Sequence, residues 1–155
     1  MKEWIQCRES SDLFWLESLK EAHSNLVQAI SVLEELTRGP VPSKERLVAA
    51  RYDLSKASLE RRLLWGRIHA YLARSASPEA ESALRTLQQS DIALLRAAAS
   101  HVGRWTTDVI LEDWIGYCRA SAAMRLKLTD AVAPEERLLY PLLQRSAGEA
   151  RFIGG

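Results

Sequence analysis

Apolar residues recur along the chain at steps of three and four positions, which is the period of one face of a helix. The first such run follows Ser10-Ser11-Asp12, whose side chains can cap free helix amides. It comprises Leu13, Leu16, Leu19, His23, Leu26, Ile30 and Leu33. Gly39-Pro40 then stops the pattern. The sequence therefore predicts a long amphipathic helix between these two boundaries.

Three more helices are predicted after this stop. The second runs from about Lys44 to Arg74, with Leu47, Leu54, Leu59, Leu63 and Ile68 among its apolar positions. The third starts at Ser77-Pro78-Glu79, because serine caps, proline suits the first turn and an acid favours the positive end of the helix dipole. Gly103 ends it. Thr106-Thr107-Asp108 caps the fourth, whose inner face comprises Ile110, Trp114, Tyr117, Ser121, Met124, Leu128, Ala131 and Glu135.

Pro134 interrupts the fourth pattern. Proline removes a backbone donor and crowds the preceding turn, so we expect a break there and a short fifth helix to about Ala147. No segment alternates as a strand does, and β-branched residues are sparse. We expect an all-α protein, an up-down-up-down four-helix bundle with a short C-terminal fifth helix, forming one domain over residues 1–155 with a core at about 11–147.

Two polar residues fall on the inner faces of these helices. His23 and Asp91 are each flanked by leucines one turn away in both directions. Burying either side chain without a partner would cost roughly one to several kcal/mol. We therefore expect both to have polar partners inside the protein.

A repeated phrase indicates what these partners are. The run Glu60-Arg61-Arg62-Leu63-Leu64-Trp65 is echoed by Glu135-Glu136-Arg137-Leu138-Leu139-Tyr140, which places Glu60 and Glu135 at matching positions of the second and last helices. Glu136 lies one position further round. Together with His23 and Asp91, these carboxylates form an oxygen-rich set that suits iron or manganese.

Simpler explanations remain open for each of these residues. His23 can be a buried histidine bonded to one carboxylate, and Asp91 and Glu60 can be solvated surface charges. Glu135 and Glu136 directly follow Pro134, where acidic residues favour the start of a helix whatever else they do.

Composition narrows the classes of function. The chain of 155 residues has 47% apolar residues and carries 21 basic against 20 acidic side chains, so a general electrostatic attraction to nucleic acid is not expected. Cys7 and Cys118 form no disulfide framework, and no run is apolar enough to cross a membrane. We expect a cytoplasmic protein that binds neither nucleic acid nor membranes, with a homodimer or a protein partner as its macromolecular contact.

The sequence resembles the hemerythrin-like (HHE cation-binding) domains over roughly Leu13 to Leu143. The resemblance is carried by Leu-x-x-x-His ending at His23, by the Glu-x-x-Leu-Leu-Trp turn starting at Glu60, and above all by the run from Glu135 to Leu143. It implies a four-helix bundle with a non-haem di-iron centre. The roles of such domains are oxygen binding, nitric oxide or oxygen sensing, and repair of iron–sulfur clusters.

The family's ligand pattern is kept only in part. Its first histidine falls on His23, and the glutamate of its His-x-x-x-Glu motif falls on Glu60 and again on Glu135. The histidines expected four positions earlier are replaced by Lys56 and Ala131, and the third-helix histidine by Asp91. We therefore hypothesise that the ammonium group of Lys56 supplies the charge of a lost metal, in a network with Glu60, Asp91 and Glu135 and with His23 as a neutral neighbour.

Three functions follow from this interpretation. The leading one is a non-enzymatic binding or regulatory module without a cofactor, since no nucleophile with a base and no phosphate loop is present. The second is a metalloprotein with iron or manganese at His23, Glu60, Asp91 and Glu135 that handles oxygen or nitric oxide. The third is a helical scaffold for protein interactions.

Overall fold

The computed structural model describes residues 2–74 and 76–152, and the side chains of residues 11–74 and 76–144. Within these ranges the chain forms helices and connecting loops, and no strand. The helices are α1 (Lys2–Arg38), α2 (Lys44–Ala73), α3 (Pro78–Arg104), α4 (Thr107–Glu112) and α5 (Trp114–Phe152). The predicted all-α class is confirmed.

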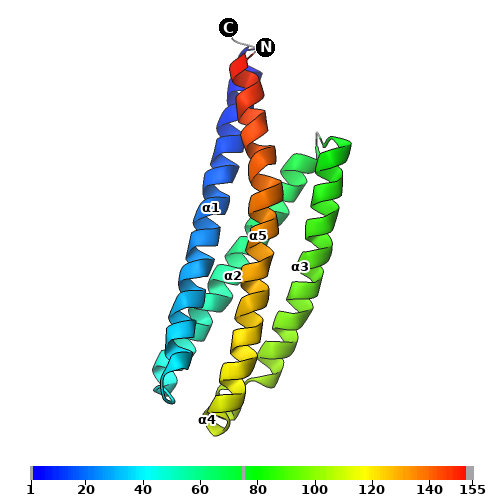
Figure 1. Ribbon diagram of the computed structural model, residues 1–155. Coiled ribbons are helices and arrows are strands. Elements are labelled where there is room, and N and C mark those ends of the chain that lie inside the picture. The colour runs from blue at the N-terminus through cyan, green and yellow to red at the C-terminus, as the bar shows by residue number, and fades with distance from the viewer. Residues whose placement is uncertain (1, 75, 153–155) are drawn as a thin grey trace.

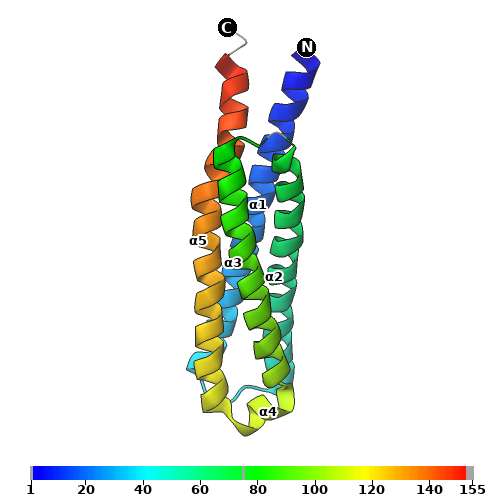
Figure 2. The same cartoon turned by 90° about the vertical axis from the view of Figure 1, so that its right-hand side faces the viewer.

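Four long helices lie side by side, and successive ones run in opposite directions (Figure 1). Seen from the side, α3 lies in front, between α5 and α2, and α1 lies behind (Figure 2). Helix α1 packs closely on α2 and α5, and α3 packs more closely on α5 than on α2. The contact between α2 and α3 is thus the loosest between neighbouring long helices.

Helix starts follow the capping residues of the sequence. The hydroxyl oxygen of Ser43 accepts from the amide of Arg46 at 3.3 Å, and that of Ser77 accepts from Ala80 at 3.2 Å. Each bond satisfies one of the amides that a helix start leaves without an intrahelical partner. The predicted starts of α2 and α3 are confirmed.

The predicted start of the first helix is wrong. Helix α1 begins at Lys2, and Asp12 lies inside it with 1% of its surface exposed. The carboxylate of Asp12 accepts a hydrogen bond from the hydroxyl of Tyr71 on α2. The aspartate that suggested a cap is therefore a partner in a contact between helices.

The predicted break at Pro134 is also wrong. Helix α5 continues through Pro134 and Pro141, and the short helix is α4, before α5 rather than after it. Buried residues on both sides of Pro134, such as Val132 and Leu139, pack on the other helices, so the tertiary contacts outweigh one lost hydrogen bond. Glu135 was also explained as an acid that favours the start of a helix. That explanation is wrong, because Glu135 lies in the interior of α5.

The chain breaks at Asp113 instead. The residue ends α4, and its carboxylate accepts from the amide of Gly116 at 2.9 Å in the first turn of α5. A Cβ atom on residue 116 would lie 2.2 Å from Asp113 Oδ2, so the glycine leaves room for this cap. The inner face predicted for the last helix is nevertheless correct at Tyr117 and Met124, which are buried.

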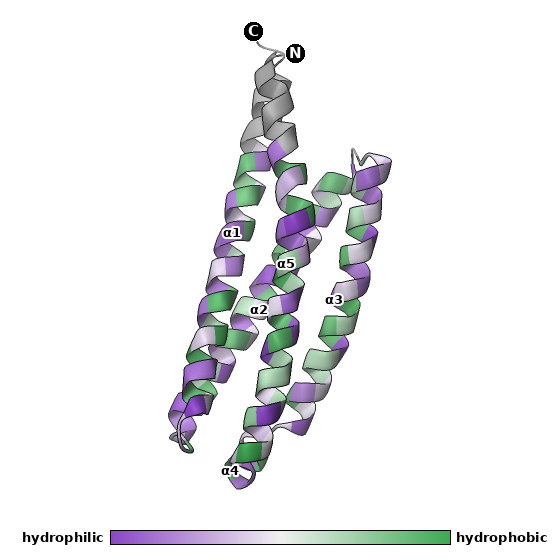
Figure 3. Ribbon diagram, in the orientation of Figure 1, coloured by the Kyte–Doolittle hydropathy of each residue, from purple (hydrophilic) through white to green (hydrophobic). Residues whose placement is uncertain are grey.

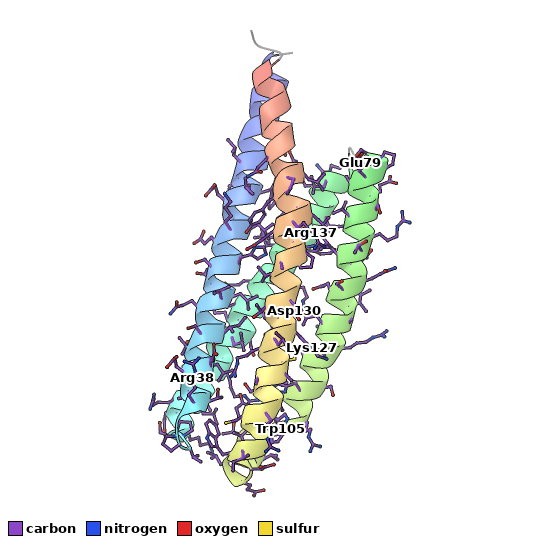
Figure 4. All side chains as sticks on the ribbon, in the orientation of Figure 1. Arg38, Glu79, Trp105, Lys127, Asp130 and Arg137 are labelled. Carbon is purple, nitrogen blue, oxygen red and sulfur yellow. The ribbon has the colours of Figure 1, made fainter. Side chains whose placement is uncertain are left out.

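Three apolar clusters follow one another along the long axis, and Figure 3 shows the alternation of hydrophobic and hydrophilic segments on each helix. The Leu19 cluster comprises Leu16, Leu19, Trp65, Ile68, Leu72, Leu84, Leu87, Leu139 and Leu143. The Leu26 cluster comprises Leu26, Ala29, Ile30, Ala57, Leu94, Met124, Leu128 and Val132. The Trp105 cluster comprises Leu47, Trp105, Ile110 and Tyr117, and Ile110 belongs to α4. Figure 4 labels Trp105 of this cluster.

Charged side chains lie on the outer surface of the helices. Lys127 and Asp130 on α5, for example, are exposed (Figure 4). None of the helices, over the residues that the structure describes, has the length and apolar character that crossing a lipid bilayer requires.

Candidate functional site: a polar layer and the adjoining cavity

A layer of four charged or polar side chains separates the Leu19 cluster from the Leu26 cluster. We call it the polar layer, and it comprises His23 on α1, Arg61 on α2, Asp91 on α3 and Glu135 on α5. On each helix the layer residue stands between a member of one cluster and a member of the other, as Asp91 does between Leu87 and Leu94. Every long helix thus contributes one side chain at the same depth.

Arg61 and Glu135 form the centre of the polar layer. Both are 2% exposed. Arg61 Nη2 donates to Glu135 Oε1 and Arg61 Nε donates to Oε2 at 3.2 Å, so the guanidinium holds both oxygens of the carboxylate. Charge-assisted bidentate bonds of this kind are stronger than neutral ones, especially away from water.

Asp91 stands on the other side of Arg61. Its Oδ1 lies 3.7 Å from Arg61 Nη1, and its side chain is 17% exposed. Burial raises the pKa of Asp91 above its ordinary value, and the charges of Arg61 and Arg62 oppose this change. Asp91 is therefore an outer member of the layer, held less tightly than Glu135.

His23 joins α1 to α5. Its Nε2 lies 2.5 Å from Glu135 Oε2, and its Nδ1 lies 2.7 Å from the hydroxyl of Tyr140. Because the carboxylate that binds Arg61 only accepts, we assign the Nε2 proton to His23, which leaves Nδ1 to accept from Tyr140. Burial and the charges of Glu136 and Glu135 raise the pKa of Tyr140 to about 12, so its hydroxyl keeps its proton.

The structure brings together three of the predicted site residues and leaves two on the surface. His23, Asp91 and Glu135 converge, and His23 is a buried histidine bonded to a carboxylate, as one interpretation held. The prediction that Lys56 and Glu60 point inward is wrong: their side chains are 60% and 52% exposed and lie 4.0 Å apart on the outer face of α2. Glu136 is exposed, and its charge contributes to the raised pKa of Tyr140.

Arg61 is the residue that sequence reasoning missed. The leucine pattern favoured a face of α2 with Leu59 and Leu63, yet these are 45% and 56% exposed. The buried face comprises Leu47, Ala50, Ala57, Arg61, Trp65, Ile68 and Leu72. The repeated phrase aligns Glu60 with Glu135 and so indicated the wrong residue of α2. The residue that binds Glu135 is the next one, Arg61, at a sequence separation of 74. The spacing of Ala57, Arg61 and Trp65 was the available signal.

The ligand set that the family resemblance implies for a metal does not assemble here. Among the side chains that the structure describes, no group of three or more His, Cys, Asp and Glu is arranged to hold a metal ion. Both oxygens of Glu135 bind Arg61, and the guanidinium charge at this position opposes a second cation. A metal would have to displace Arg61 to reach Glu135.

A cavity of about 330 Å³ adjoins the polar layer. It lies between α2 and α3, where these helices pack loosely, and α5 forms its floor. We call it the α2–α3 cavity. Its walls are mainly apolar, with Leu54, Leu94, Ala98, Met124 and Leu128 on the inside. The volume falls in the range of small-molecule sites.

Two arginines meet the cavity at the end near α4. Arg51 Nη2 donates to the backbone oxygen of Trp105 at 2.6 Å, and its Cζ lies 5.9 Å from the ring centre of Tyr117. Arg125 Nη1 donates to the hydroxyls of Thr37 at 2.9 Å and Ser121 at 3.2 Å. Among the described side chains, neither guanidinium has an acidic partner within ion-pair distance.

Tyr117 and His101 stack at this same end, with ring centres 6.0 Å apart. Burial raises the pKa of Tyr117, although the charges of Arg51 and Arg125 oppose the increase. Burial, and then the charge of Arg51, lower the pKa of His101, which keeps it neutral at pH 7. This end of the cavity therefore presents two positive charges beside neutral hydrogen-bonding groups.

Comparisons of the chain with protein-family models, with curated proteins and with solved structures found no match.

Proposed function

We propose that this protein is a non-enzymatic binding module, an up-down-up-down four-helix bundle of hemerythrin-like ancestry in which a polar layer replaces the metal centre. The observation that carries the proposal is the binding of both Glu135 oxygens by Arg61, with His23 and Asp91 as the flanking partners. Arg61 supplies the positive charge that a metal would otherwise supply among these acids.

The layer stabilises the fold rather than performing chemistry. Breaking a buried ion pair by removing one partner costs about 3–5 kcal/mol, because the other charge stays buried alone. A layer so placed also favours one register of the four helices, since sliding any helix by a turn would leave a charge among leucines. The binding capacity then belongs to the α2–α3 cavity next to it.

The proposal is tested by metal analysis. The protein is produced in medium supplemented with iron and manganese, purified without chelators, and its metal content and visible absorption are measured. We expect far less than one ion per chain and no absorption of an oxo-bridged iron pair. Stoichiometric iron or manganese, with loss of helicity on its removal, would establish the metalloprotein alternative instead.

A pair of variants tests the role of the guanidinium directly. Arg61→Leu removes the positive charge from the polar layer, whereas Lys56→Leu removes one from the surface at the position that matches the family's histidine. If Arg61 excludes cations, Mn²⁺ binds Arg61→Leu more tightly than it binds the unaltered protein or Lys56→Leu. Equal binding by all three would show that the guanidinium does not replace a metal. Circular dichroism checks that each variant is folded.

A further inference from the structure

We propose that the α2–α3 cavity binds a long-chain carboxylate, with its carboxylate group between Arg51 and Arg125 and its hydrocarbon along the apolar walls toward Asp91. This inference rests on the proposed function and specifies the ligand class of the binding module. It is carried by three features of the cavity: its charge, its shape and its open side.

The charge at the end near α4 favours an anion. Arg51 and Arg125 together use three guanidinium bonds, all to neutral oxygens of Trp105, Thr37 and Ser121. Arginine has five donors, so both guanidinium groups keep N–H groups that can bind a carboxylate. Asp91 is the only acidic side chain among the described residues that line the cavity, and it stands with Arg61 and Arg62 at the opposite end.

The shape fits a chain rather than a compact group. The cavity follows α2 from Arg51 to Arg62 and α3 from Val102 back to Asp91. At the rise of an α-helix, this stretch is about 16 Å long. Its inner wall is formed by side chains such as Leu54, Leu94 and Leu128, which offer a hydrocarbon continuous apolar contact.

The open side of the cavity is also apolar. Tyr52 and Leu59 on α2 are 65% and 45% exposed, and Leu95 and Val102 on α3 are 47% and 54% exposed. All four line the cavity, so they form a hydrophobic rim on both sides of its opening. Apolar surface gathered around a cavity marks a binding site more often than apolar residues scattered singly. A hydrocarbon in the opening would cover this rim.

Isothermal titration calorimetry tests the proposal with dodecanoate, added below the concentration at which it forms micelles. We expect one dodecanoate per chain. Decanoate should bind about tenfold more weakly, because it buries two fewer methylene groups. Dodecanol, which keeps the chain and lacks the charge, should bind at least about tenfold more weakly than dodecanoate. Equal binding of dodecanol, or no binding of dodecanoate, would overturn the proposal.

Three variants locate the site. Arg51→Gln and Arg125→Gln should each weaken dodecanoate binding by about tenfold or more and leave dodecanol binding unchanged, and Ala98→Phe should fill the cavity and abolish both. Arg96→Gln, on an exposed position of α3 outside the lining, is the matched control and should bind as the unaltered protein does. Dodecanoate binding that is unaffected by Arg125→Gln and Ala98→Phe would place the ligand elsewhere.

Sedimentation velocity examines the main competing occupant, a second copy of the chain. A dimer that Ala98→Phe dissociates, in a protein that takes up no dodecanoate, would show that the apolar rim is a subunit interface and would overturn the proposal. The metal content of the same sample reports separately on the proposed function. Failure of dodecanoate to bind a metal-free protein therefore refutes only the ligand.

Discussion

The carboxylate of Glu135 on α5 and the guanidinium of Arg61 on α2 bind each other through two parallel hydrogen bonds, across a sequence separation of 74. Helices α2 and α5 make almost no direct backbone contact with each other, so the side-chain pair spans the interior between them. His23 and Asp91 attach to this pair from the two remaining helices. The pair is thus the point at which all four long helices are connected.

Arg61→Ala should lower the free energy of unfolding by about 3–5 kcal/mol, because it leaves the charge of Glu135 buried without its main partner. Urea denaturation followed by circular dichroism measures the change. Lys56→Ala, whose surface pair with Glu60 is exposed, is the control and should change stability by less than about 1 kcal/mol. A larger loss of stability in Lys56→Ala than in Arg61→Ala would contradict the orientation of α2, with Arg61 inside and Lys56 outside.

Glu135→Gln and Asp91→Asn should differ in their effects, although both remove an acid from the polar layer. Glu135 is fully buried and holds Arg61 by two bonds, so its loss should cost about 3 kcal/mol or more at pH 7. Burial raises the pKa of Asp91 above 3.8, so ionisation of this carboxyl group is less favourable in the folded protein than in the unfolded chain. The stability that is lost in this way above pH 3.8 is regained as the pH falls. Asp91→Asn should therefore change stability at pH 7 by less than about 1 kcal/mol. Equal costs for the two variants would refute this ranking.

Tyr140→Phe should lower the free energy of unfolding at pH 7 by about 1 kcal/mol, because it removes the hydrogen bond to His23 Nδ1. Tyr52→Phe, at a residue 65% exposed, is the matched control and should have no measurable effect. The same urea titrations measure both variants. An unchanged stability in Tyr140→Phe would show that the hydroxyl contributes nothing to the position of His23.

The stability of the unaltered protein should fall with pH in the alkaline range. The pKa of Tyr140 is raised from 10.0 to about 12 by burial and by the charges of Glu136 and Glu135, so the folded protein holds this proton more tightly than the unfolded chain does. The stabilisation is complete below pH 10 and is lost as pH rises toward 12. Urea titrations across this range should show a steeper decline for the unaltered protein than for Tyr140→Phe. Parallel declines would contradict the raised pKa.

Pro134→Ala should raise the free energy of unfolding by about 1–2 kcal/mol, because alanine restores a backbone hydrogen bond within α5. The greater conformational entropy of the unfolded chain without proline offsets only part of this gain. Pro78→Ala is the control. Pro78 occupies the first turn of α3, where its missing N–H costs nothing, so its replacement should bring no gain. Thermal unfolding compares the two, and a loss of stability in Pro134→Ala would show that α5 requires its proline.

Much of the helical architecture could be predicted from the sequence because capping and periodicity act within a few residues. The starts of α2 and α3 follow from Ser43 and Ser77, and the depth of His23 and Asp91 follows from the leucines around them. The continuity of α5 through Pro134 could not be predicted in this way. It depends on contacts of Val132 and Leu139 with residues far away in the sequence.

Local patterns in the sequence are enough to specify that the chain is helical, where most helices begin and which faces of α1, α3 and α5 turn inward, because each of these depends on residues within a few positions of one another. Which face of α2 is buried depends on the helices that pack against it. Leu59 and Leu63, which were expected on the inner face, are exposed, and Arg61 is buried instead. Arg61 gains a carboxylate on α5 and a second on α3 when it turns inward. The spacing of Ala57, Arg61 and Trp65 fits this face, but the partners that make burial of the arginine favourable lie on other helices.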